Sequence, residues 1–148
     1  MTDFDTLMDR LKLHHDALKE ANTLNKAAVF AALAPAGITS VTVEFDGEGD
    51  SGQIEAITAC AGDAHVSLPE TRVTLQRTSW GGETISTTEE TLRQAIETLA
   101  YDYLEQEHGG WENNDGAFGT FHFDVAKRTI QLEFNGRYTD VATHNYDF

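Results

Sequence analysis

Cysteine is scarce in this sequence, and long apolar runs and a basic N-terminus are missing. It has a single cysteine among 148 residues, Cys60, which excludes an internal disulfide and a zinc site built from several cysteines. No segment approaches the roughly 18 consecutive apolar residues that a membrane-spanning helix needs. The acidic start of the chain, Met1–Asp5, has neither the positive charge nor the apolar stretch of a signal peptide. We therefore expect a cytoplasmic protein.

Basic residues are scarce: ten lysines and arginines stand against 25 aspartates and glutamates, for a formal net charge of −15. They are absent from two long stretches, residues 27–71 and 94–126. The acids in those stretches are Glu44, Asp46, Glu48, Asp50, Glu55, Asp63, Glu70, Glu97, Asp102, Glu105, Glu107, Glu112, Asp115 and Asp124. Such a negative field repels phosphate groups, which argues against direct binding to nucleic acid or to an anionic membrane. Three explanations stay open: a soluble acidic surface, a docking face for a basic partner, or a cation site.

The sequence does contain enough apolar material for one folded domain. Hydrophobic residues make up 40% of it and include eight phenylalanines, a composition typical of globular domains and not of disordered chains. No internal repeat or interdomain linker is visible, so we expect a single domain over residues 1–148. We divide it into N-terminal helices at about 3–34, a sheet with one long helix at about 38–135, and a tail at 136–148.

The first part of the chain has the apolar spacing of helices. A first amphipathic helix is predicted to run to about Ala21, and its apolar residues are Phe4, Leu7, Met8, Leu11 and Leu18. A second, alanine-rich helix is predicted from about Leu24 to Leu33. It should end before Pro35 and Gly37, because proline cannot continue a helix and glycine favours its termination.

The apolar spacing then changes to that of strands, in which every second residue is apolar. Strands are predicted at about 41–46, 53–59, 72–77, 121–125 and 130–134, and Ser79–Ser86 is predicted to be a loop. Thr87 or Thr88 should cap a long helix that ends before Gly109. The buried stripe of that helix is Leu92, Ala95, Ile96, Leu99 and Tyr103.

These elements follow the order ααβββαββ, with hairpins in place of βαβ units. The order indicates an α+β fold, in which an antiparallel sheet of about five strands carries helices packed on one face. The tail, Arg137–Phe148, either adds an edge strand or stays irregular.

The most distinctive segment is His108–Gly119, with the sequence HGGWENNDGAFG. Its glycines and asparagines favour turn conformations, whereas His108, Glu112 and Asp115 are residue types that serve as acids, bases or ligands. Their spacing lacks the i, i+4 arrangement of helical zinc motifs. Three roles stay open: a structural one in which Trp111 closes the end of the core, a partner or ligand surface, and catalysis. We expect no enzymatic activity and no cofactor.

A predicted turn at Asp46–Gly52 has acids at alternate positions, as at the start of a calcium-binding loop. The match fails at the sixth position, where Ser51 replaces glycine, and at the twelfth, where Ile57 replaces glutamate. A weak site for a hard cation, made of oxygen ligands, stays open. Its candidate ligands are Asp46, Asp50 and Asp115.

Two motifs together resemble those of a known family. They are Phe45–Ile54 (FDGEGDSGQI) and His108–Gly116 (HGGWENNDG), and Phe121–Asp124 (FHFD) follows them. The combination resembles a family of small acidic bacterial proteins of unknown function, often found on plasmids or phage. The resemblance covers roughly residues 39–134 and transfers no catalytic residue, because the family has no established activity. It implies a genomic setting in which small acidic inhibitors of host defence systems are common cargo.

The sequence therefore predicts a non-enzymatic acidic protein that docks on a basic, nucleic-acid-binding host protein. Carboxylates on a rigid scaffold would imitate the phosphate array that such a partner binds. The candidate partner-binding residues are Asp46, Glu48, Asp50, Glu55, Trp111, Glu112 and Asp115. The alternative is a module that binds a divalent cation or a small ligand through the two Gly/Asp-rich loops, which would have to converge.

Overall fold

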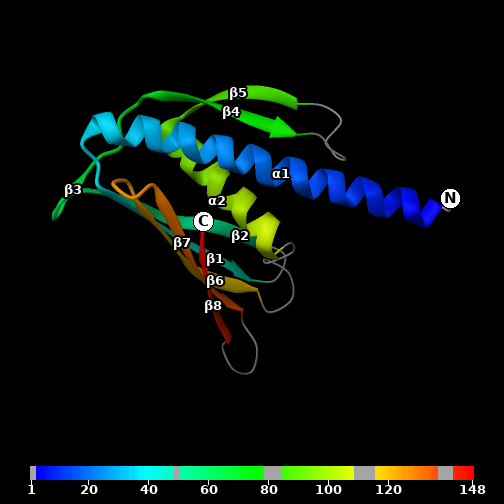
Figure 1. The fold of residues 1–148 in the computed structure, drawn as a ribbon. Helices are drawn as coiled ribbons and strands as arrows, with labels where there is room; N and C mark the ends of the chain where they lie inside the picture. The colour runs from blue at the N-terminus through cyan, green and yellow to red at the C-terminus, as the bar shows by residue number, and fades with distance from the viewer. Residues whose placement is uncertain (1–2, 49–50, 79–84, 109–115, 137–141) are drawn as a thin grey trace.

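The computed structural model describes residues 3–48, 51–78, 85–108, 116–136 and 142–148 (Figure 1). The helices are α1 (Asp3–Leu33), a short 3₁₀ turn η1 (Ala34–Ala36) and α2 (Leu92–His108). The strands are β1 (Ser40–Glu48), β2 (Ser51–Ala61), β3 (Ala64–Val66), β4 (Arg72–Thr78), β5 (Ile85–Thr91), β6 (Ala117–Asp124), β7 (Thr129–Gly136) and β8 (Ala142–Asp147). Among these helices, none has the length and apolar content needed to cross a membrane.

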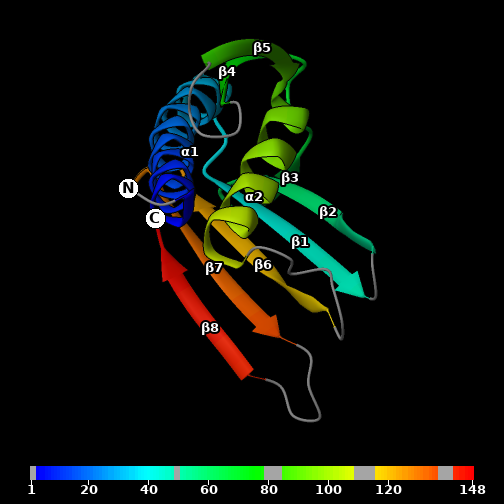
Figure 2. The same cartoon turned by 90° about the vertical axis from the view of Figure 1, so that its right-hand side faces the viewer.

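The α+β fold class is confirmed, although the strand count is higher than predicted. Six antiparallel strands form one sheet in the order β3-β2-β1-β6-β7-β8, and β4 and β5 form a separate sheet of two strands. Both helices lie on the same side of the large sheet, and the small sheet lies beyond them (Figures 1 and 2). The predicted antiparallel sheet with helices on one face is therefore confirmed; the main sheet has six strands where about five were expected, and a second small sheet is added.

The two predicted N-terminal helices are one continuous helix, α1. Asparagine and threonine, at positions 22 and 23, have low helix propensity and would favour a break between Ala21 and Leu24. Tertiary contacts override that propensity: Asn22 is buried and donates a hydrogen bond to Gln106 Oε1 at 3.0 Å. The hydroxyl of Thr23 donates to the Lys19 carbonyl one turn back, as threonine can within a helix.

The predicted end of this helical region is confirmed. Helix α1 stops at Leu33, and Pro35 lies in the 3₁₀ turn that follows. Gly37 has a φ of +76° and donates its N–H to the Ala34 carbonyl. This left-handed conformation strains residues that carry a Cβ, so glycine is the residue suited to the turn.

The start of α2 was predicted three or four residues too early. Thr87 and Thr88 belong to β5, where they pair with Gln76 and Leu75, because runs of threonine favour strands. The helix begins at Leu92, after a capping box at Thr91. The Thr91 hydroxyl accepts from the Gln94 N–H, and the Gln94 side chain accepts from the Thr91 N–H, both at 3.2 Å.

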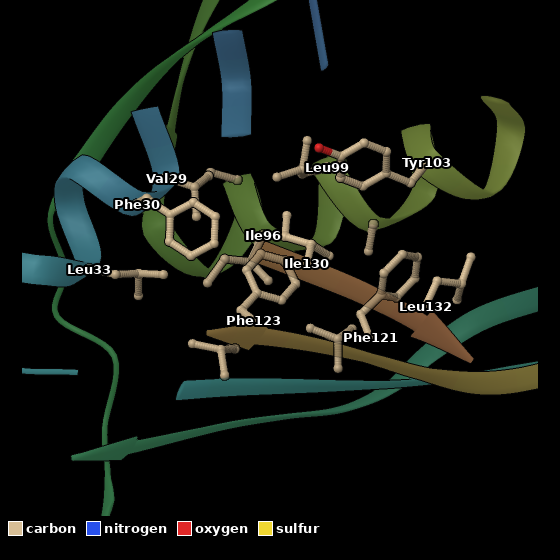
Figure 3. Close-up of a cluster of buried hydrophobic side chains, with 14 of the residues drawn as sticks. Val29, Phe30, Leu33, Ile96, Leu99, Tyr103, Phe121, Phe123, Ile130 and Leu132 are labelled. Carbon is tan, nitrogen blue, oxygen red and sulfur yellow. The ribbon is translucent and has the colours of Figure 1, made fainter. Parts of the chain in front are cut away.

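One apolar core lies between the helices and the sheets. Side chains from α1 and α2 meet those of β6 and β7 (Figure 3); the rings of Phe30 and Phe123, for example, have centroids 5.9 Å apart. The predicted stripe of α2 is buried as expected, from Leu92 to Tyr103. The second hairpin is confirmed too, because β6 pairs with β7 and buries Phe121.

The predicted strand at 72–77 exists as β4, but it does not join the main sheet. Asn25 of α1 is 2% exposed and lies against the edge of β4. Its amide nitrogen donates to the Gln76 carbonyl at 3.0 Å, and its oxygen accepts from the Gln76 N–H at 2.7 Å. One side chain thus satisfies main-chain groups at a strand edge that would otherwise be open to another strand.

The tail forms an edge strand, which was one of the two expected outcomes. Strand β8 pairs with β7, and the Phe148 N–H donates to the Ile130 carbonyl at 2.8 Å. The Phe148 ring stacks on Tyr103, with centroids 4.5 Å apart and an interplanar angle of 13°. Lys26 of α1 donates to the Phe148 main-chain oxygen at 2.6 Å. These contacts anchor the last strand to both helices.

Candidate docking face on the open side of the sheet

The six-stranded sheet has one covered face and one open face. Along β1, the buried residues Val41, Val43 and Phe45 point toward the helices, so Thr42 and Glu44 point the other way. No described helix or strand lies over that second side in either view (Figures 1 and 2). We call it the open face. Antiparallel sheets commonly bury one face and expose the other.

The open face is acidic. Strand register and alternation place on it Glu44, Asp46, Glu55, Asp124, Glu133 and Asp147. None of the six strands of the sheet contains a lysine or an arginine. Arg72, Arg77 and Arg93 pair with acids that lie on the helix side of the molecule, on β5 and α2. The carboxylates of the open face therefore share a surface from which the strands bring no positive charge.

A β-bulge sets the position of Glu55. Glu44 pairs with Ala56 and Phe45 pairs with Ile54, which leaves Glu55 as the extra residue of β2. The extra residue allows both Ile54 and Ile57 to pack against the core. The N–H of Ile54 donates to the Tyr101 hydroxyl of α2 at 2.9 Å, so a helix on the covered side holds the bulge.

Four acids, Glu55 of the bulge among them, lie around one hollow of about 290 Å³. Its acidic side chains are Glu44, Asp46, Glu55 and Glu133. Phe118 and Thr120 of β6 also line the hollow, between the acids of β1 and Glu133 of β7. Gln53 donates to Glu55 Oε1 at 3.1 Å and so orients that carboxylate. A concave acidic surface with an aromatic residue in it suits a protruding basic side chain, since arginine pairs with carboxylates and stacks on rings.

A larger hollow of about 690 Å³ lies at the other end of the open face. It is lined by His122, Asp124 and Asp147, and also by Lys127 from the β6–β7 turn. The Lys127 main-chain N–H donates to Asp124 Oδ1 at 3.1 Å, so this carboxylate already orders the turn. The mixture of charges makes this end less suited to a basic partner than the hollow beside Glu44.

The structure brings together some of the residues predicted from sequence. Asp46 and Glu55 both line the smaller hollow, and Glu48 ends β1 opposite Ser51. The other predicted partner-binding residues lie outside the described residues; they are Asp50, Trp111, Glu112 and Asp115. Gly47 of β1 pairs with Ala117 of β6. The described residues next to segment 49–50 and those next to segment 109–115 are therefore neighbours at one end of the sheet.

Sequence reasoning did not select Glu44 and Glu133 as site residues. Both occupy alternate positions between buried residues, so alternation alone predicts that they point outward. Their proximity follows from β6, whose Thr120 pairs with Glu44 on one side and with Glu133 on the other. That pairing joins two separate hairpins, and no short-range pattern in the sequence indicates it.

The candidate cation site gains no support from the described part of the chain. Within that part, no group of three His, Cys, Asp or Glu side chains could hold a metal ion. Of the three candidate ligands, Asp46 lies in the acidic hollow, whereas Asp50 and Asp115 lie outside the described residues.

Asp102 belongs to an acid-rich stretch of the sequence but not to the acidic surface. It is only 9% exposed and accepts a hydrogen bond from Arg77 Nη1 at 2.9 Å. Burial raises the pKa of Asp102 to about 6; Arg77 opposes this shift, and Glu105 and Glu90 reinforce it. The folded protein therefore binds this proton more tightly than an unfolded chain does, and the contribution of Asp102 to stability falls as the pH rises from about 4 to about 6.

The variant Asp102→Asn should lack this pH dependence. Each unit of pKa shift corresponds to about 1.4 kcal/mol, so Asp102 should cost the wild type about 1 kcal/mol of unfolding free energy between about pH 5 and about pH 7. Urea unfolding of both proteins at several pH values measures the difference. Wild-type and variant curves that stay parallel across this window would show that Asp102 titrates near its ordinary value.

Comparison with known protein families finds a match. The model of a family described as a family of unknown function, DUF6878, matches residues 21–148. No curated protein and no solved structure matches the chain. The family match covers both sheets, α2, and α1 from Ala21 onward.

Proposed function

Since the chain belongs to DUF6878, a family of unknown function, we propose a function from the geometry of the open face. The protein is a non-enzymatic interaction protein, and this face docks on a basic, nucleic-acid-binding host protein. The observation that carries the proposal is the gathering of Glu44, Asp46, Glu55 and Glu133 around one hollow, on strands that contain no lysine or arginine.

The sheet provides the rigid spacing that imitation of a phosphate array requires. Successive outward residues of one strand lie about 6.8 Å apart, and neighbouring strands about 4.8 Å apart. Glu44 and Asp46 are successive outward residues of β1, and Glu133 lies two strands away across β6. The fixed carboxylates can therefore occupy a groove that binds the charges of a nucleic-acid backbone.

The energetics favour fast association that is sensitive to salt. A single exposed ion pair contributes only about 0–1 kcal/mol, so no one carboxylate dominates. The summed field of a surface with one sign of charge instead raises the association rate, and dissolved salt screens it. The formal charge of −15 strengthens this steering toward a cationic partner.

The proposal extends to a biological setting. A phosphate-mimicking protein carried on a plasmid or phage would act in the cytoplasm, where it would block a nucleic-acid-binding protein of a host defence system. The acidic open face is compatible with that setting, and the neighbouring genes test it directly.

Reversing the charge at the hollow should weaken docking. We expect Glu44→Lys with Glu133→Lys to weaken binding by about tenfold or more, because about 1.4 kcal/mol of lost attraction corresponds to tenfold in affinity. Wild type and variant are immobilised and exposed to host extract at low and high salt. Proteins retained only by the wild type are purified, and their affinity is measured with and without competing duplex DNA.

The matched control reverses two acids elsewhere, Asp63→Lys with Glu70→Lys. Both residues are exposed, in the connections on either side of β3, and the control has the same net charge as the test variant. The control should bind nearly as well as the wild type, and duplex DNA should compete with it. If both variants lose affinity equally, or if salt and DNA have no effect, the open face is not the docking site.

A further inference from the structure

The N-terminal half of α1 extends beyond the rest of the molecule (Figure 1). Among the described residues, the exposed large hydrophobic side chains are Leu7, Met8, Leu11, Leu13, Leu24 and Val66. Four of these six lie between residues 7 and 13. This extension also precedes the part of the chain that matches the family, which begins at Ala21. Leu7, Met8 and Leu11 fall within about 100° of one another around the helix, and an exposed apolar cluster of this kind marks an interaction surface.

The exposed residues continue a helix face that is buried further along. Residues 4, 7, 11, 14, 18, 21 and 25 are spaced alternately three and four apart, which is the heptad spacing of paired helices. On this line Asn25 is 2% exposed and Ala21 is 4% exposed, whereas Leu11 is 40% and Leu7 is 49% exposed. The face that packs against the body therefore continues past it without a described partner.

Charge is distributed differently in the extension and in the body. Residues 1–20 hold five acidic and three basic residues, so their formal charge is only −2. Residues 21–148 hold 20 acidic and seven basic residues, a formal charge of −13. Two bodies of this charge repel each other, whereas two extensions can approach closely.

We propose that a second copy of this chain covers the apolar line, through antiparallel pairing of the two N-terminal extensions. Leu7 of one chain then packs near Leu18 of the other, and Leu11 lies near the centre. The antiparallel arrangement places the acidic bodies at opposite ends of the pair. This inference is independent of the open face, which stays accessible in both copies.

Self-association tests the proposal, and the chain offers a matched pair of substitutions. The full-length wild type should show a concentration-dependent monomer–dimer equilibrium by sedimentation equilibrium. Leu11→Glu should weaken the dimer at least tenfold, because it buries a carboxylate at the centre of the helix pair. Leu13→Glu makes the same chemical change at a residue that is 58% exposed and lies on the opposite side of the helix. It should change the dissociation constant less than twofold.

Cross-linking tests the orientation. In a Cys60→Ser background, chains with Thr6→Cys mixed with chains with Lys19→Cys should form mixed disulfides faster than either chain forms disulfides alone. A wild type that stays monomeric at every concentration would overturn the proposal, as would equal effects of Leu11→Glu and Leu13→Glu. If the monomeric Leu11→Glu variant melts at a lower temperature than the monomeric wild type, Leu11 packs against its own chain. That result would also overturn the dimer proposal. Binding through the open face is a separate measurement, so either idea can fail alone.

Discussion

Replacing Gly119 by alanine should destabilise the fold by about 3 kcal/mol, the largest effect we expect from a single added methyl group. A Cβ at this position would lie 2.0 Å from the Glu133 carbonyl oxygen and 2.9 Å from Cζ of Phe45. Gly119 pairs with Phe45 on one side and with Phe134 on the other, and these two rings stack with centroids 6.2 Å apart. The rings and the neighbouring strand occupy the space that the methyl group would need.

Relief of this overlap requires a shift of β7, because a main-chain oxygen cannot move away alone. Gly62→Ala is the matched control: Gly62 has a φ of +63°, and a Cβ there would meet nothing within 4 Å. That variant should cost about 1 kcal/mol through backbone strain alone. Urea unfolding of both variants measures the difference. A Gly119→Ala protein no less stable than Gly62→Ala would show that β6 and β7 do not approach so closely.

Asn25→Ala should cost a similar amount, about 3 kcal/mol. The substitution removes both hydrogen bonds to the Gln76 main chain, and each buried polar group left without a partner costs about 1–3 kcal/mol. The loss is local to the contact between α1 and β4. Hydrogen exchange of the Gln76 amide should therefore accelerate far more than that of amides in the six-stranded sheet.

Thr23→Ala serves as the control for Asn25→Ala. It lies on the same helix, and its hydroxyl makes only a local bond to the Lys19 carbonyl at an exposed position. Its effect should stay within about 0.5 kcal/mol. The role of Asn25 in holding β4 would be contradicted if Asn25→Ala lost no more unfolding free energy than Thr23→Ala. Equal acceleration of hydrogen exchange in both sheets would contradict it too.

Much of the fold could be predicted because several signals are local. The apolar stripe of α2, from Leu92 to Tyr103, and the alternating residues around Phe121 follow directly from periodicity. The α+β class follows from hairpins that lack crossover helices. Each of these inferences depends on residues that are close in sequence.

The features that were missed depend on contacts between distant residues. Continuity of α1 depends on Asn22, whose partner Gln106 is 84 residues away. Separation of β4 and β5 from the main sheet involves Asn25, which binds a residue 51 positions away. A propensity scale counts both asparagines as helix-weakening, because it contains no information about partners elsewhere in the fold.

The candidate site shows the same division. The outward direction of Glu44 and Glu133 could be predicted from alternation, whereas their place around one hollow follows from the pairing of β1 with β6. Asp102 shows the opposite error, since an acid in an acid-rich stretch turned out to be buried against Arg77. Acid-rich stretches of a sequence therefore do not locate an acidic surface: Asp102 lies in such a stretch and is buried, whereas Glu133 lies outside them and lines the acidic hollow.

The bulge in β2 makes the two sides of the sheet dependent on each other. The phenol of Tyr101, on the side of the helices, holds the main chain beside Glu55, which points to solvent on the other side. A substitution that displaces α2 would therefore change the spacing of carboxylates on the open face, although the substituted residue does not contact them. Substitutions in α2 could in this way change which partner the open face binds while every acid stays in place. Relatives with identical acids could then bind different partners.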